Sequence, residues 1–135
     1  MLIIKKYSLT TLSRLPDTNI VFMEYIKNLR VDLLVAQELV ASRLDFMGDQ
    51  MHYILIDFSN LRQLTYEAKQ YMQSAEGGGK NILGGAFIAS NPVAALLANI
   101  FVKTQKTIPV KFFSDRKDAL LWIEKLKQSS DNAIS

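Results

Sequence analysis

Apolar and polar residues along the chain follow a pattern that predicts strands alternating with helices. Short apolar runs rich in β-branched and aromatic residues, each bounded by turn residues, indicate five strands. These runs cover residues 2–9, 20–26, 52–58, 83–89 and 108–113. The run at 52–58 is almost continuously apolar, as expected for a central strand that is covered by helices on both faces of a sheet.

Two helices are expected in the first half of the chain. Over residues 32–46, apolar side chains recur at three- and four-residue spacing, which is typical of an amphipathic helix. This pattern assigns Ser42 and Arg43 to the polar side of the helix. Thr65 is suited to cap a second helix, which ends before three consecutive glycines at 77–79 because glycine is unfavourable in a helix.

Two more helices are expected in the second half. Asn91 followed by Pro92 is a strong signal for a helix start, with asparagine as the cap and proline in the first turn. The helix that follows, residues 93–103, is apolar on nearly every side. Ser114 or Asp115 is suited to cap the last helix.

The resulting order, β-β-α-β-α-β-α-β-α, predicts a single α/β domain with a five-stranded mixed sheet and about four helices. The first two strands are close enough to pair as an antiparallel hairpin with a long connection. Strands separated by helices should pair in parallel through right-handed crossovers. We expect residues 1–128 to form the domain and residues 129–135 to form a frayed polar tail.

Composition limits the classes of function. The 135 residues suit one domain. The absence of cysteine excludes thiol catalysis and thiolate metal sites and suits a reducing cytoplasm. The 16 basic and 13 acidic residues are scattered along the chain, unlike the concentrated basic surface of a nucleic-acid-binding protein. No signal peptide or membrane-spanning segment is evident, and we expect no cofactor and no metal.

The glycines and the single histidine have structural explanations. The run 77–79 before Lys80 lacks the spacing of a phosphate-binding loop, follows a helix and precedes a strand. Gly84 and Gly85 lie within a strand, where glycine permits close packing by a helix or the approach of a ligand. His52 lacks the partners of a metal site or a catalytic triad.

The loop after the central strand is the first candidate site. Asp57 ends that strand, where ligands bind in open α/β sheets, although its carboxylate could instead cap the amides of Asn60 or Leu61. Asp57 with Glu67 is the one catalytic pair that we can suggest, and a histidine or metal partner is missing, so an enzyme is not expected. The candidate residues are Asp57, Ser59, Asn60, Thr65, Tyr66 and Glu67.

The apolar helix at 93–103 is the second candidate site. A helix of this kind in a soluble protein is either buried or meets a partner. Leu97, Ile100 and Phe101 are therefore predicted to form a self-association surface or the wall of a ligand site. We expect a homodimer that uses this helix.

Residues 54–65, Ile-Leu-Ile-Asp-Phe-Ser-Asn-Leu-Arg-Gln-Leu-Thr, resemble the strand-loop-helix signature of STAS domains of the SpoIIAA type, the sporulation anti-sigma-factor antagonists. The order of elements matches as well, and the segments 89–92, 97–101, 108–110, 113–115 and 119–123 are similar to a bacterial branch of unassigned function. Antagonists in this family carry a phosphorylated serine at the helix start. Tyr66 stands at that position here, so phosphorylation of the usual kind is not implied, and Thr65 is the nearest hydroxyl.

Two functions from different classes remain open. The resemblance implies a non-enzymatic regulatory module that acts through protein contacts around the loop from Asp57 to Glu67. The alternative is a small-molecule or lipid binder with a pocket between the sheet and the apolar helix. The glycine pair and the apolar character of 93–103 motivate this second reading.

Overall fold

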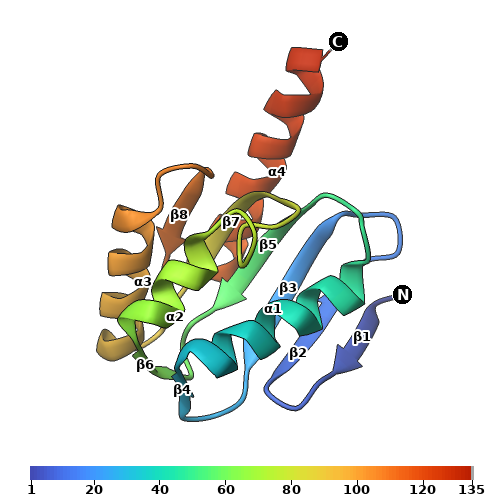
Figure 1. The fold of residues 1–135 in the computed structure, drawn as a ribbon. Helices are drawn as coiled ribbons and strands as arrows, with labels where there is room; N and C mark the ends of the chain where they lie inside the picture. Colours follow the sequence, from blue (N-terminus) through green and yellow to red (C-terminus); the bar gives the residue numbers. More distant parts are fainter. Residues whose placement is uncertain (135) are drawn as a thin grey trace.

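A computed structural model describes residues 1–134 as one α/β domain (Figure 1). The helices and strands form where the sequence provides caps, apolar runs and turns. They are β1 (Ile3–Lys6), β2 (Thr10–Arg14), β3 (Ile20–Tyr25), β4 (Leu29–Val31), α1 (Leu33–Met47), β5 (His52–Asp57), β6 (Leu61–Leu64), α2 (Tyr66–Gln73), β7 (Ile82–Ile88), α3 (Pro92–Thr104), β8 (Val110–Phe113) and α4 (Arg116–Ile134).

The main sheet has six strands in the order β1-β2-β3-β5-β7-β8. β1, β2 and β3 pair antiparallel, whereas β3, β5, β7 and β8 pair in parallel. Helices α1, α2 and α3 pack on one face of the sheet and α4 packs on the other (Figure 1). The mixed α/β class is confirmed. Strand β5 is apolar and buried because helices cover both faces of the sheet around it.

The prediction of five strands in the sheet was wrong, because the expected strand at 2–9 is β1 followed by a turn into a further strand, β2. The Tyr7 amide donates to the Thr10 carbonyl at 2.8 Å and closes this turn. β3 therefore pairs with β2 and not with β1. The sequence hides β2 because Leu12 is its one large apolar residue, fully buried under α1.

A second sheet, absent from the prediction, consists of β4 and β6 paired in parallel. These strands have three and four residues, too few to show an alternating pattern. The pair lies at the carboxyl ends of β3 and β5 and leads the chain into α1 and α2 (Figure 1).

The predicted helix starts are confirmed by their caps. The side chains of Asp32, Thr65 and Asn91 each accept a hydrogen bond from the backbone amide three residues further along the chain, at 2.9, 3.2 and 2.9 Å. At the other end of the chain, α4 continues to Ile134 and projects beyond the sheet, where residues 128–131 are exposed (Figure 1). The polar tail expected from residue 129 is thus helical through Ile134, and Ser135 lies outside the described residues.

Aromatic rings join α3 to the sheet. Phe58 has no exposed surface and lies at the centre of this cluster. Its ring centroid is 5.9 Å from that of Tyr25, 5.2 Å from that of Phe87 and 6.0 Å from that of Phe101. Large buried rings dominate the energetics of a core of this size, so this cluster fixes the position of α3.

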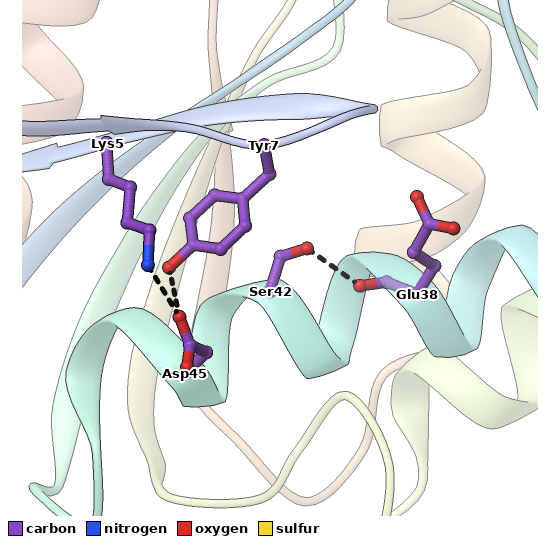
Figure 2. A network of polar contacts seen from close by, with 5 residues as sticks. All are labelled: Lys5, Tyr7, Glu38, Ser42 and Asp45. Carbon is purple, nitrogen blue, oxygen red and sulfur yellow. Dashed lines mark hydrogen bonds and ion pairs between the residues drawn. The ribbon is translucent and has the colours of Figure 1, made fainter.

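The edge strand β1 is held against α1 by polar contacts (Figure 2). The Lys5 ammonium and the Tyr7 hydroxyl both donate to Oδ2 of Asp45, at 3.1 and 2.7 Å. The Tyr7 hydrogen bond, followed by that of Lys5, lowers the pKa of the Asp45 carboxyl. The pair is well exposed, so it orients the edge strand and contributes little to stability.

Across residues 1–134, no helix is both long enough and apolar enough to cross a membrane.

Candidate functional site

A cavity lies between the sheet and the three helices on its α1 side. Its volume is about 50 Å³. The sheet contributes Met23, Ile54, Ile56, Gly85, Phe87 and Val110 to its wall. The helices contribute Leu39, Val40, Arg43, Met72 and Phe101. The wall is therefore apolar except at a few points, as in most sites for small molecules.

The two strand glycines face opposite sides of the sheet. A Cβ atom at Gly84 would lie 2.6 Å from Cδ2 of Leu126, so this glycine lets α4 pack closely. Gly85 lines the cavity, and a Cβ atom there would lie 3.2 Å from Cγ2 of Ile54. Of the two roles that the sequence left open for this pair, Gly84 has that of close helix packing, whereas Gly85 borders the cavity.

Arg43 brings a positive charge into the wall of the cavity. Only 2% of the residue is exposed. Its guanidinium donates to Nε2 of His52 at 2.8 Å and to the carbonyls of Lys80 and Gly78 at 3.0 and 3.1 Å. Burial lowers the pKa of Arg43 to about 10, so the group is charged at neutral pH. Among the described residues, no carboxylate forms an ion pair with it.

His52 supports Arg43 from the start of β5. The imidazole is fully buried, and its Nδ1 atom lies 2.8 Å from the Gln50 carbonyl. Because that carbonyl can only accept and Arg43 can only donate, Nδ1 carries the proton and Nε2 accepts. Burial lowers the pKa of His52 to about 4. The structural role expected for this histidine matches the geometry.

The three glycines at 77–79 fold back onto the end of α2. A Cβ atom at Gly78 would lie 2.0 Å from the Met72 carbonyl oxygen. The tight return places Gly78 beside the loop that follows α3. Gly78, Gln105 and Ile108 are partly exposed members of the lining, so the cavity reaches the surface between these two loops.

The polar side chains of the loop after β5 form hydrogen bonds mainly with other groups of the same chain. Asp57 accepts from the Ser59 amide at 2.8 Å, so it caps the turn, although at Ser59 and not at the predicted Asn60 or Leu61. Ser59 Oγ accepts from the Ser90 amide and hydroxyl, at 3.1 and 2.8 Å. Asn60 donates to the Tyr25 carbonyl at 2.8 Å.

The helix start after this loop is more open. Thr65 is occupied as the cap of α2. Tyr66 is 67% exposed and Glu67 is exposed beside it. Within residues 1–134, no hydrogen bond or group of metal-binding side chains joins Asp57 to Glu67. The suggested catalytic pair is thus not linked directly in the described structure.

The three residues singled out on the apolar helix lie in different environments. Phe101 is 4% exposed and lines the cavity. Leu97 is partly buried against the core, whereas Ile100 is 42% exposed. The outward stripe of α3 consists of Val93, Leu96 and Ile100. Phe101 thus borders the cavity, Ile100 belongs to the exposed stripe, and the roles of ligand wall and self-association surface stay predictions.

Sequence reasoning missed Arg43 as a site residue and assigned it, with Ser42, to the polar side of α1. Both are buried, so that assignment was wrong. The signal was present in the spacing: Leu39, Arg43 and Met47 are four residues apart and share the buried face.

Comparison with known proteins places the chain in a family. A sequence model of a domain of unknown function, DUF7793, matches residues 15–127. The chain belongs to the DUF7793 family. The sequence of this DUF7793 domain matches none of the curated proteins.

A solved structure shares the fold of this DUF7793 domain. It is an uncharacterised protein of the DUF3478 family from Shewanella loihica PV-4, described as having a SpoIIAA-like fold. The similarity covers 90% of this chain and 92% of that chain, with a TM-score of 0.55 and 21% sequence identity. The SpoIIAA-like fold expected from the sequence is therefore confirmed.

Proposed function

We propose that this DUF7793 domain is a non-enzymatic binding module that holds a small, mainly apolar molecule in the cavity between the sheet and α3. The observation that carries the proposal is the composition of the cavity wall. Of the described residues that line it, all are apolar or glycine except Arg43 and Gln105. Such a wall binds by excluding water from apolar surface.

The surrounding structure supports binding at this place. Gly85 opens the sheet side of the cavity and Phe101 closes the helix side. Met23 and Met72 add flexible, polarisable side chains that adapt to the shape of a guest. A volume of about 50 Å³ suits a molecule of few heavy atoms, or one end of a longer molecule that extends between the two loops.

Titration with 1-butanol, followed through backbone amide NMR signals, tests this proposal. We expect saturable shifts centred on Gly85, Phe87 and Phe101. Val40→Phe places a ring in the cavity and should abolish them, whereas Leu121→Phe adds the same ring on the exposed side of α4 and should leave them unchanged. Shifts that do not saturate, or that persist in Val40→Phe, would contradict the proposal.

Protein contacts around the loop after β5 are a second candidate function, favoured by one observation. Tyr66, at the start of α2, exposes 67% of its surface next to the exposed Glu67. An exposed aromatic beside a charge is typical of a contact residue in an interface. A regulatory role of the kind implied by the SpoIIAA-like resemblance would use this position.

Pull-down from the host organism tests the loop. Tyr66→Ala combined with Glu67→Ala should remove a specific partner, while Lys127→Ala, on α4, should retain it. Thr65→Ala is unsuitable, because Thr65 caps α2 and its loss would weaken the helix. Recovery of the same proteins with every variant would rule out this function.

The homodimer expected through α3 is a separate proposal, for which Val93, Leu96 and Ile100 form the available surface.

A further inference from the structure

We infer that the cavity is selective for small aliphatic carboxylates, with the carboxylate group bound by Arg43 and the aliphatic part held by the apolar wall. The inference rests on the proposed function of the cavity and adds the chemical class of its ligand.

The hydrogen bonds of Arg43 leave part of its capacity unused. A guanidinium has five N–H donors in a planar fork. Three of them serve His52, Lys80 and Gly78, and all three acceptors are neutral. Within the described chain, no hydrogen bond is formed by the remaining two donors, and Nε is not fully buried, so it is open to a ligand or to solvent. A buried cation without a counter-charge is costly, and a carboxylate supplies both the missing charge and two acceptor oxygens in matching geometry.

A second unpartnered polar group lies on the same side of the sheet. The Tyr25 hydroxyl is buried and has no hydrogen-bond partner among the described residues. Burial raises the pKa of this phenol, and the positive charge of Arg43 opposes that rise, so the two groups are within electrostatic range. Tyr25 stacks on Phe58, which contacts the cavity residue Phe101. Tyr25 itself does not line the cavity, so its hydroxyl is a donor near Arg43 and not a contact of the ligand.

The surface around the opening also favours anions. Lys80 precedes β7 at one edge of the opening, and Lys106 follows Gln105 at the other; both are exposed. Glu76 is the acidic residue in the same glycine loop. The local balance is positive, and positive charges near an apolar opening raise the local concentration of an anionic ligand.

The size of the cavity limits the ligand. The enclosed volume is about 50 Å³. By comparison with a cavity of roughly 150 Å³ that holds the six carbons of benzene, it encloses about two heavy atoms, so the rest of the ligand lies in the opening between the two loops. Butyrate is therefore a suitable probe. Butyramide has the same shape and no charge, which makes it the matched neutral control.

Arg43 also braces the glycine loop through the Gly78 and Lys80 carbonyls, and a purely structural role has to be separated from ligand binding. NMR titrations of the wild-type domain at pH 7 and constant ionic strength do this without a variant. We expect butyrate to bind at least about tenfold more tightly than butyramide, as hydrogen bonds to charged groups imply. The Nε–H signal of Arg43 should shift with butyrate only.

One variant extends the test. Arg43→Met should raise the Kd for butyrate at least about tenfold and change that for butyramide little. If Arg43→Met does not fold, the comparison of butyrate with butyramide on the wild-type domain still decides the question. Equal binding of butyrate and butyramide to the wild type would overturn the carboxylate preference and leave the proposed cavity function standing. Binding of neither butyrate, butyramide nor 1-butanol would overturn both.

Discussion

Replacing Phe58 with alanine is expected to lower the free energy of unfolding by about 3–5 kcal/mol, the cost of removing a fully buried phenyl ring. Phe58 has no exposed surface and touches the rings of Tyr25, Phe87 and Phe101. Its removal leaves a void that these rings can fill only in part. Urea denaturation of the wild type and the variant measures the difference.

Two controls define this prediction. Phe58→Leu keeps most of the apolar volume and should cost less than Phe58→Ala. Tyr66→Ala removes an aromatic ring that is 67% exposed, and it should change the free energy of unfolding by no more than about 0.5 kcal/mol. Similar losses for Phe58→Ala and Tyr66→Ala would show that the aromatic cluster does not hold α3 in place.

The domain is also expected to lose stability on acidification, by on the order of 3 kcal/mol between about pH 6.5 and pH 4. The pKa of His52 falls from 6.5 to about 4 on folding. In this pH range the unfolded chain takes up a proton that the folded chain excludes, so unfolding is favoured as the pH falls. Protonation of Nε2 would set it against the Arg43 guanidinium, 2.8 Å away.

His52→Gln isolates this contribution. The glutamine carbonyl can still accept from Arg43, but it does not titrate. The free energy of unfolding, measured by urea denaturation between pH 7 and pH 4, should depend less on pH in the variant. Asp45, whose pKa is lowered from 3.8, acts below this range and is common to both proteins. Parallel pH profiles of wild type and variant would refute the role given to His52.

Local signals explain which parts of the fold could be predicted. Asp32, Thr65 and Asn91 reveal three helix starts, because a cap depends on residues within one turn. β2 could not be found in this way. Thr10 and Ser13 are buried in it because neighbouring strands and the layers on the two faces of the sheet cover them. Burial of polar residues by distant parts of the chain leaves no periodic trace in the sequence.

The candidate site shows the same limit. Phe101 could be named as a wall residue because the whole helix around it is apolar. Arg43 could not be named, because a charged residue is usually exposed. Two of its acceptors, the carbonyls of Gly78 and Lys80, are also distant in the sequence and belong to no motif. The cavity depends on how four strands and three helices meet, which no short motif encodes.

The order of the strands has a consequence for how the chain reaches this structure. β1 and β2 pair residues as near as Lys6 and Thr11, so their association closes only a short loop. β3 and β5 pair residues as distant as Ile20 and Tyr53, with all of α1 between them. The entropy lost on loop closure is thus concentrated in the parallel half of the sheet. The cavity belongs to that half, so formation of its walls requires the loop closures that cost the most entropy.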